Sequence, residues 1–574
     1  MNFRLFDGLR RDASAVEVDH IEAFAQGRIG RRDFLTRGTV LGLSVPFMSA
    51  VIAACGSSDS GSTSPVTTIG GPATTGGPAT TGAPAAGTVK PGGVLKVANQ
   101  KPSGPVDPVA MDNLGAYTVA SIPLEYLCGP GDGAALAPML AESWKPNTDG
   151  SVWTFSLRKG VKWHDGTPFT SADVVATLDR LADAGLKASI AKGASKAVDA
   201  TTVEVTLLAA DGNFPYQVSN WNPQSLITPV AFVAGTTIDA MPTGTGPFKL
   251  TKYDAATGAT FARNDDWWGG KPNLDGVELI FSDSPETQIQ GLLGDAVHAM
   301  VQFPVIGGEA VFAQADKYVV EGIRGASHRQ IWMNSREGNF ADKRTRQAIA
   351  LGLDREAIIK NVLRGKGDLG NDHPIAPVYD FWDKSQPQRT RDVEKAKQLL
   401  KDTGKEGLAL TMNVVDLQEI SKTAELIKSQ LAEIGMNVTL NVESTDTVYS
   451  KWCAVYDSKT EPAGCDGGEE FGIVDYGNRA TPDVYLTKAY ATGEWNSAHF
   501  INADFNTAVD AYKAGLDTSS RATAIKKIQE IATEEVPYAI PYFVNSLTAY
   551  SNKVTGIKQT GLGHYYLGTA GFVA

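Results

Sequence analysis

Residues 157–174 read LRKGVKWHDGTPFTSADV, a stretch that joins the end of a strand, a turn and the start of a helix. The residues before it, 153–157, alternate between apolar and polar side chains, as a half-buried strand requires. The residues after it, 171–182, place apolar side chains at helical spacing, and Asp173 stands where it favours the first turn of a helix. Gly166 suits the turn between them. The stretch therefore predicts a strand and a helix in succession.

The same patterns extend over the rest of the chain. A two-residue alternation recurs at 94–98 and 202–207, and helical spacing recurs at 286–293, 343–352, 355–363, 393–400, 423–434 and 521–532. The range 423–434 leads through Gly435 into an alternating run at 437–442, which is half of an α/β unit. We expect a mixed α/β body from about residue 93 to residue 574, divided into two lobes.

Composition limits the class of protein. The chain has 574 residues, of which 42% are hydrophobic and 20% charged, with a formal net charge of -12. An acidic balance argues against a nucleic-acid-binding surface. The body has no run of about 20 apolar residues, so a multi-pass membrane protein is excluded.

The first 55 residues have the pattern of an export signal. Arg31 and Arg32 precede Asp-Phe-Leu and a moderately apolar run over 40–54, an order typical of twin-arginine export. The run ends in Ile-Ala-Ala-Cys-Gly, where small residues before Cys55 suit cleavage and the thiol suits acylation, as in bacterial lipoproteins. Two or three acyl chains, at about 0.8 kcal/mol per buried CH₂, make a durable anchor. The alternative is an apolar segment in which Cys55 is incidental.

Residues 56–92 have low complexity, and Gly-Pro-Ala-Thr-Thr occurs at 71–75 and again at 77–81. Such a composition cannot offset the entropy lost on folding, so we predict a disordered tether. Further along, Cys453 and Cys465 flank a turn-rich run, and outside the cytoplasm they suit a disulfide that closes a hairpin. Two independent thiols are the alternative.

Several further motifs follow one another along the chain. They are LAESW at 140–144, DGSVWTF at 149–155, GTGPF at 244–248, RNDDWW at 263–268, RQAIA at 346–350, DR at 354–355, the segments 392–404 and 430–438, and VPYAIPY at 536–542. Together with residues 157–174, this series resembles the extracellular solute-binding proteins of family 5, the oligopeptide-, dipeptide- and nickel-binding components of ABC importers. The resemblance covers nearly all of the chain after the tether. We interpret most of the motif residues as structural.

The resemblance implies a two-lobed α/β fold of the type II periplasmic-binding-protein kind, with an extra inserted subdomain, that closes on a ligand between the lobes. The expected domains are the signal at 1–55, the tether at 56–92, the first lobe at 93–135, 243–330 and 540–574, the inserted subdomain at 136–242 and the second lobe at 331–539. Such a protein needs no catalytic residues and no cofactor. It needs a few charged anchors and roomy apolar walls.

Asp475, in FGIVDY at 471–476, is the sharpest candidate for a ligand contact. It resembles the family position where, in peptide binders, an aspartate pairs with the α-ammonium group of the ligand. Here the run GNRAT intervenes before Pro482, a departure that puts peptide specificity in question, and an Asp that caps a turn is the alternative.

Aromatic and arginine side chains complete the candidate site. Trp452, Tyr476, Trp221 and Tyr117 are candidates for its apolar walls, although each also suits a core. Arg329 and Arg479 are candidates for holding a ligand carboxylate, although each also suits the surface.

A metal site is not predicted. The seven histidines show no pair at helical spacing, and no Cys-x-x-Cys occurs; the histidines are His20, His164, His298, His328, His373, His499 and His564. Ligands from separate segments, or a chelated metal, remain open.

The sequence therefore predicts a monomeric, lipid-anchored solute-binding protein on the extracytoplasmic face of the cell membrane. Its expected partners are a small ligand, with peptide favoured, and the permease subunits of an ABC importer. A surface receptor without transport is one alternative. An exported hydrolase is another, although the chain lacks Gly-x-Ser-x-Gly and His-Glu-x-x-His.

Overall fold

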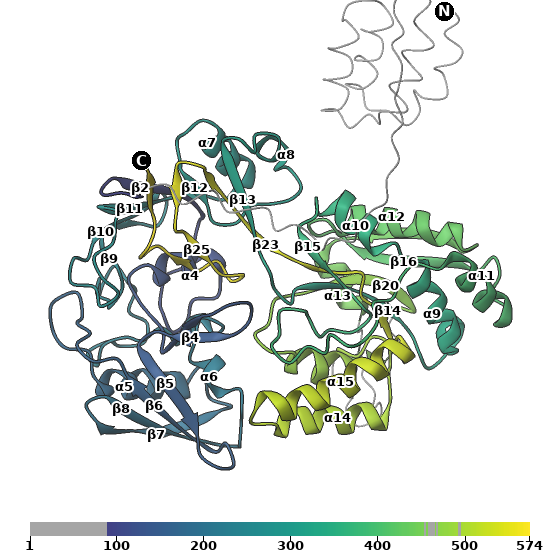
Figure 1. Cartoon of the computed structure of the whole chain (residues 1–574), viewed down its shortest axis with the longest axis horizontal. Helices are drawn as coiled ribbons and strands as arrows, with labels where there is room; N and C mark the ends of the chain where they lie inside the picture. The colour runs from purple at the N-terminus through teal and green to yellow at the C-terminus, as the bar shows by residue number, and fades with distance from the viewer. Residues whose placement is uncertain (1–88, 453–454, 457–464, 467–468, 492–494) are drawn as a thin grey trace, which may run out of the picture. The chain divides into compact units, whose positions relative to one another are not determined.

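The computed structural model describes residues 89–452, 455–456, 465–466, 469–491 and 495–574. Within these residues, the chain forms two lobes, each built on a β-sheet with helices beside it (Figure 1). The predicted signal, with Cys55, and the tether up to residue 88 lie outside the described residues, as does Cys453. The tether prediction is wrong at its end, because Val89 and Lys90 form a strand, β1, that pairs with β27 (Gly571–Val573).

The first lobe is built on a seven-stranded sheet of order β13-β23-β12-β2-β11-β10-β9. Its strands are β2 (Val94–Gln100), β9 (Phe248–Asp254), β10 (Gly258–Arg263), β11 (Gly276–Ser282), β12 (Ala299–Met300), β13 (Tyr318–Ile323) and β23 (Ser546–Ser551). The helices beside it are α4 (Leu114–Ser121), α7 (Pro285–Leu293) and α8 (Glu309–Phe312). Strand β2 lies in the middle, parallel to β11 and β12, and its residues Leu95 and Val97 are fully buried. The alternation in the sequence at 94–98 thus marks a central strand.

The inserted part contains residues 157–174, the stretch that predicted a strand and a helix in succession. It forms a four-stranded antiparallel sheet of order β5-β6-β8-β7, with α5 (Ser171–Ala182) beside it. The strands are β5 (Ala141–Pro146), β6 (Val152–Leu157), β7 (Ile190–Asp199) and β8 (Thr202–Leu207). Phe155 of β6 and Leu178 of α5 are fully buried, and Asp173 accepts a hydrogen bond from the backbone N–H of Thr170 at the helix start, at 2.9 Å. The predicted strand and helix are confirmed.

Buried side chains of this part and of the first-lobe sheet, such as Phe155 and Leu95, belong to one continuous hydrophobic cluster. The inserted part is therefore packed onto the first lobe, and the two share a core. The second lobe has a separate hydrophobic cluster of its own.

The second lobe is built on a six-stranded sheet of order β15-β22-β14-β20-β16-β17, with β21 paired to β14. Its strands are β14 (His328–Met333), β15 (Gly367–Leu369), β16 (Ala409–Val415), β17 (Asn437–Glu443), β20 (Phe471–Tyr476), β21 (Tyr538–Ala539) and β22 (Tyr542–Val544). Its helices are α9 (Lys343–Gly352), α10 (Arg355–Val362), α11 (Val393–Asp402), α12 (Ile420–Glu433), α13 (Thr445–Trp452), α14 (Ala503–Ala514) and α15 (Thr518–Glu535), with a helical turn η5 (Tyr485–Tyr490). Strands β16 and β17 are parallel and joined by α12, and Gly435 has a φ of 89° just after the helix. This is the α/β unit that the sequence predicted.

Two adjacent segments connect the lobes. Residues 324–327 lead from β13 to β14, and Asn545 leads from β22 to β23. Their backbones run side by side, because Ile323 pairs with Ser546 and the N–H of Val544 donates to the carbonyl of Ser327 at 2.7 Å. Two short neighbouring connections are the arrangement that a hinge between two bodies needs.

The predicted two-lobed α/β fold of the type II periplasmic-binding-protein kind is confirmed. Among the described residues, no helix combines the length and the apolar run that a membrane crossing requires.

Candidate functional site

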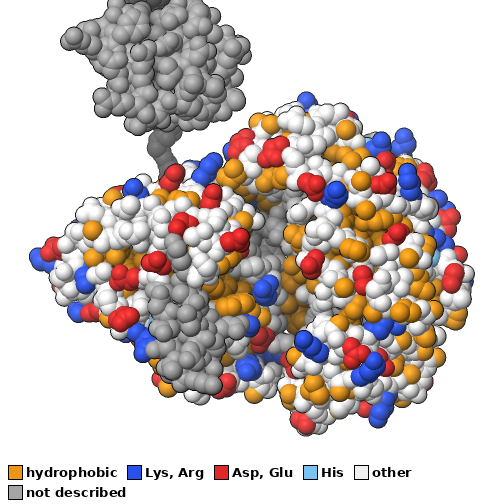
Figure 2. All heavy atoms as spheres, turned by 180° about the vertical axis from the view of Figure 1, so that it is seen from behind, with side chains coloured by type: hydrophobic (Ala, Val, Ile, Leu, Met, Phe, Trp, Pro, Cys, Tyr) orange, Lys and Arg blue, Asp and Glu red, His pale blue; other side chains and the backbone are white. Residues whose placement is uncertain are grey.

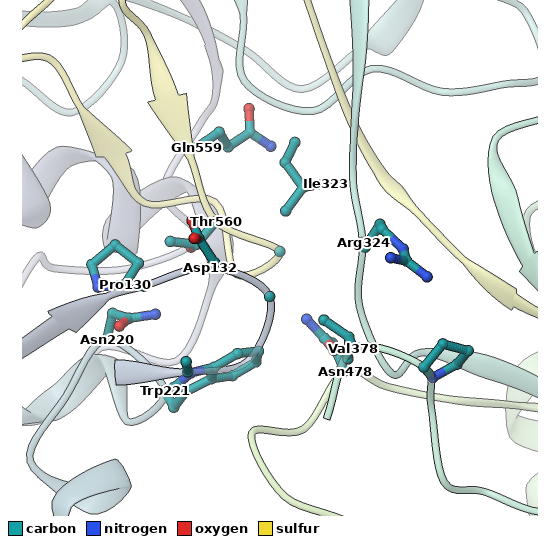
Figure 3. A pocket seen from close by; sticks show the side chains of 15 residues that line it. Pro130, Asp132, Asn220, Trp221, Ile323, Arg324, Val378, Asn478, Gln559 and Thr560 are labelled. Atoms are coloured by element: carbon teal, nitrogen blue, oxygen red, sulfur yellow. The ribbon is translucent and has the colours of Figure 1, made fainter. Parts of the chain in front are cut away.

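A pocket of about 410 Å³ lies where the two lobes and the hinge meet (Figure 3). Its lining comes from the first lobe and the inserted part (Pro130, Gly131, Asp132, Gly133, Ala135, Asn220, Trp221, Gln559, Thr560 and Gly561), from the hinge (Ile323 and Arg324) and from the second lobe (Pro377, Val378 and Asn478). On the face shown in Figure 2, a groove runs between the two halves of the molecule. A pocket of this volume is at the lower end of the range for small-molecule sites, roughly 300–1,000 Å³.

A short hairpin forms one wall of the pocket. Strands β3 (Cys128–Pro130) and β4 (Leu136–Pro138) pair, and the turn between them is closed by hydrogen bonds from Gly131 N–H to Ala135 O at 3.0 Å and from Ala135 N–H to Asp132 O at 3.1 Å. The tip reaches the second lobe, because Ala134 N–H donates to Val378 O at 3.4 Å. Gly133 has a φ of 63°, and a Cβ there would lie 2.9 Å from the same oxygen, so the contact requires glycine.

Trp221 lies beside this hairpin. A parallel bridge joins Cys128 to Ser219, so the chain that continues to Trp221 runs along β3. The Ser219 hydroxyl accepts a hydrogen bond from Trp221 N–H at 3.2 Å and orients the turn. The indole is half-buried, lines the pocket and packs against the hydrophobic cluster of the second lobe. One side chain of the inserted part thus packs on the second lobe and lines the space between the lobes.

Asn478 fixes the opposite wall to the hinge. Its Oδ1 accepts a hydrogen bond from Ala326 N–H at 2.7 Å. A Cβ at Gly561 would lie 2.4 Å from its Nδ2, and a Cβ at Gly325 would lie 2.9 Å from its Oδ1. Glycines therefore let this carboxamide sit between the hinge and the first lobe.

The charges of the pocket are few. The Arg324 guanidinium donates to both carboxylate oxygens of Asp368 at 2.8 and 2.9 Å, so its charge is balanced. Asp132 is exposed, and within the described part of the chain its carboxylate has no hydrogen bond or ion pair. The pocket therefore presents one carboxylate that no cation of the described residues offsets.

Asp475, the sharpest candidate from the sequence, lies on β20 and is not part of this pocket lining. It accepts a hydrogen bond from the hydroxyl of Tyr449, and it lies opposite Arg329 across the β14–β20 pair. Arg329 is itself buried, with 2% of its side chain exposed, and its guanidinium donates to Glu419 at 2.8 and 3.1 Å and to Gln418 at 2.7 Å. The structure places Arg329 in an internal ion pair beside Asp475.

Tyr476 and Trp452 lie in an aromatic cluster. The Tyr476 ring stacks on His328 with centroids 5.2 Å apart, and it meets Trp452 edge-on at 6.1 Å. Burial lowers the pKa of His328 to about 4, so its imidazole is neutral at physiological pH. The Tyr476 hydroxyl and the Trp452 Nε1 are buried, and neither has a hydrogen-bond partner among the described residues. The two rings are brought together, and each keeps an unused polar atom.

The remaining candidates lie at other edges of the site. Arg479 is exposed and donates to the carbonyl of Asn478 at 3.1 Å. Tyr117 is half-buried and stacks on His564 at 6.1 Å, and the His564 Nδ1 meets the Thr560 hydroxyl of the pocket at 2.8 Å. Of the seven predicted ligand contacts, Trp221 alone is a lining residue of the pocket.

The cysteine and metal predictions concern regions that the structure describes in part. Strands β18 (Val455–Tyr456) and β19 (Cys465–Asp466) pair, with Cys465 opposite Tyr456, while Cys453 falls outside the described residues. Cys128 is a buried free thiol. In the described ranges, no group of three or more His, Cys, Asp or Glu residues could hold a metal ion.

Sequence reasoning missed most of the pocket lining. Asp132, Asn220, Asn478 and Gln559 come from four separate segments and belong to no recurring motif. The available signal was local: Asp132 stands between Gly131 and Gly133, a composition typical of an exposed turn. Only the fold brings that turn to the other lobe.

The two lobes also meet below the pocket lining. The Asn213 Nδ2 of the inserted part donates to the Asp483 Oδ2 of the second lobe at 2.9 Å. Burial at this contact raises the pKa of Asp483, and the nearby Asp211 carboxylate raises it further, against hydrogen bonding from Thr481. Burial and Asp211 thus favour the uncharged form of Asp483, while the hydrogen bonds donated to it favour the carboxylate.

Comparison with known proteins gives consistent matches. The sequence profile of the bacterial extracellular solute-binding proteins, family 5 Middle, matches residues 135–463. Heme-binding protein A of Haemophilus influenzae is 26% identical over 467 residues, which cover 75% of this chain and 83% of that protein. The dipeptide-binding protein of Escherichia coli is 25% identical over 494 residues, covering 78% and 89%. The unliganded open form of the periplasmic murein tripeptide-binding protein MppA has a similar structure, with a TM-score of 0.74 and 20% identity over 85% of this chain and 99% of that one.

Proposed function

Because this chain belongs to family 5 of the bacterial extracellular solute-binding proteins, we propose that it captures a small ligand for the permease of an ABC importer. The proposed ligand is a short peptide. The observation that carries the proposal is the pocket, whose lining is supplied by both lobes and by the hinge. A ligand in this position contacts both lobes at once, and it stabilises the arrangement in which they are closest. Binding and release then require no bond to be made or broken.

Relatives support peptide as the ligand class. The matched proteins include a dipeptide-binding protein and a murein tripeptide-binding protein, and the volume of the pocket suits a ligand of a few residues. In this proposal, Asp475 receives the α-ammonium group after displacing the Tyr449 hydroxyl, and Arg479 faces the ligand carboxylate. Tyr476, Trp452 and Tyr117 are apolar neighbours of the ligand, and Trp221 is a wall of the pocket. Arg329, whose guanidinium is paired with Glu419, lies opposite Asp475 and supports the site without contacting the ligand.

The N-terminal residues complete the proposal. Twin-arginine export followed by acylation of Cys55 anchors a monomer to the extracytoplasmic face of the cell membrane, and residues 56–92 let the body reach the permease. The supporting observation is the sequence pattern at 31–55.

A deletion strain tests transport and anchoring together. Uptake of the ligand should be lost on deletion and restored by the wild-type gene, and a Cys55→Ala gene should restore much less while giving a released protein. The ligand itself is to be identified by native mass spectrometry of protein purified without denaturation. Full uptake in the deletion strain would reject the importer role, and full rescue by Cys55→Ala would reject the anchor.

A further inference from the structure

The pocket wall has hydrogen-bond acceptors that nothing in the described part of the chain satisfies. Asn220 is 1% exposed and its Oδ1 has no hydrogen-bond partner, and the same holds for the buried Oε1 of Gln559. The carboxylate of Asp132 lies in the same wall. A buried acceptor without a donor costs about 1–3 kcal/mol, so this wall is short of hydrogen-bond donors rather than of acceptors.

The charges of the pocket lining favour a cationic group on the ligand. Asp132 is negative and unpaired in the described residues, while the cation of the lining, Arg324, is held by both oxygens of Asp368. A ligand carboxylate would meet Asp132 without a free counter-charge in the lining. An ammonium or guanidinium group would meet a carboxylate that has no cation beside it in the described residues.

Trp221 supplies a second element of recognition. Its indole lines the same pocket as Asp132, and Figure 3 shows the ring extending toward the space between the lobes. A cation over an indole face gains about 0.5–1 kcal/mol when exposed and about 2 kcal/mol when removed from water. Contact with the second lobe holds the ring in place.

We infer that this pocket is a subsite for a basic side chain of the ligand, with Asp132 as its counter-ion, Trp221 as its aromatic face, and Asn220 and Gln559 as polar neighbours. The inference rests on the proposed function, because it assigns the ligand as a short peptide that contains lysine or arginine. Asn478 of the pocket follows Asp475 by three residues, so their Cα atoms lie within about 11 Å of each other. A short peptide that places its α-ammonium group at Asp475 can therefore extend a neighbouring side chain into the pocket.

The experiment compares two dipeptides, Ala-Lys and Ala-norleucine, which differ in the terminal amine of the second side chain. Calorimetric titration of the full extracytoplasmic chain should show Ala-Lys binding at least tenfold more tightly. Asp132→Asn, which removes the charge and keeps the shape, should bring the two affinities to within about twofold. Asp316→Asn removes a charge from an exposed first-lobe residue outside the pocket lining, and it should leave the preference unchanged.

The outcomes separate the two levels of the proposal. Equal binding of both peptides by the wild type, or an unchanged lysine preference in Asp132→Asn, overturns the subsite and leaves peptide capture standing. If neither peptide binds while another class of solute does, the peptide assignment falls and takes the subsite with it. Loss of the preference in Asp132→Asn alone, with an unchanged melting temperature, supports the subsite.

Discussion

The region of strand β20 and the β3–β4 hairpin each contain an aspartate, but the two aspartates differ in their hydrogen bonds and neighbouring charges. Asp475 on β20 accepts a hydrogen bond from Tyr449 and lies opposite Arg329, which is paired with Glu419. Asp132 on the hairpin has no such partners in the described residues, and it lines the pocket. A family motif leads to the first aspartate, and the geometry of the pocket leads to the second. In our proposal, Asp475 of the β20 region receives the α-ammonium group that all free peptides share, while the hairpin selects the side chain.

The largest expected effect is on the free energy of unfolding, and it concerns the buried ion pair of Arg329 and Glu419 beside β20. Glu419→Ala leaves the Arg329 guanidinium, which is 2% exposed, without its counter-ion. Removing one partner of a buried pair costs about 3–5 kcal/mol, because a buried charge is left uncompensated. Urea unfolding should show this loss. Glu433→Ala is the matched control: its side chain is 57% exposed in its ion pair with Arg391, and its loss should change stability by less than about 1 kcal/mol. Equal stability of Glu419→Ala and the wild type would contradict a structural role for these charges.

Trp221→Ala should weaken ligand binding by roughly thirtyfold, about 2 kcal/mol. The indole lines the pocket and touches the second lobe, so its loss removes a ligand contact and an interlobe contact together. Trp144→Ala changes a half-buried tryptophan of the inserted part that does not line the pocket, and it should leave affinity within about twofold. Similar losses for both variants, measured by calorimetry, would remove Trp221 from the site.

Asp475→Ala should weaken binding of a free-amine peptide by about tenfold or more, close to 1.4 kcal/mol. The reason is the loss of the carboxylate that we propose for the α-ammonium group. An N-acetylated peptide, which has no ammonium group, should bind the wild type and the variant alike. If the free-amine peptide binds the wild type and Asp475→Ala with equal affinity, Asp475 does not contact the ligand. Of the two aspartates, Asp132 of the hairpin would then be the one that can bind a cation of the ligand.

The smallest expected effect is a dependence on pH. Burial, together with the nearby Asp211, raises the pKa of Asp483, whose carboxylate accepts a hydrogen bond from Asn213 of the other lobe. Because burial between the lobes raises the pKa of this acid, keeping Asp483 buried there becomes less favourable as pH rises from the ordinary aspartate range through the raised pKa. Lowering the pH from neutral should therefore strengthen ligand binding by a few-fold at most.

Asp483→Asn is the matched variant for the pH prediction, since it mimics the uncharged form. Its affinity should be nearly independent of pH over the range in which the wild type changes, as measured by the same titration. A wild-type affinity that falls on acidification would contradict the assignment.

The sequence predicted the elements and a mixed α/β body from local periodicity, and the resemblance to family 5 implied the type II periplasmic-binding-protein fold. The alternation at 153–157 and the helical spacing at 171–182 correspond to β6 and α5, and Gly435 ends α12 where expected. Such patterns record which face of an element is buried, and this can be read from one segment at a time.

The pocket could not be predicted in the same way. Asp132, Asn220 and Asn478 are far apart in the chain, and each is an ordinary loop residue in its own segment. Arg329 shows the converse: as a lone arginine it suits a ligand carboxylate, but the fold places Glu419 against it. Which charge is balanced internally and which is left for a ligand depends on contacts between lobes and strands.

The central claim is that the two lobes close on a small ligand held between them. Small-angle X-ray scattering of the purified body, with and without saturating ligand identified by native mass spectrometry, tests it directly. If the lobes close, the radius of gyration becomes smaller on binding. The decrease should be less in Trp221→Ala at the same saturation. An unchanged radius of gyration with the ligand fully bound would contradict it.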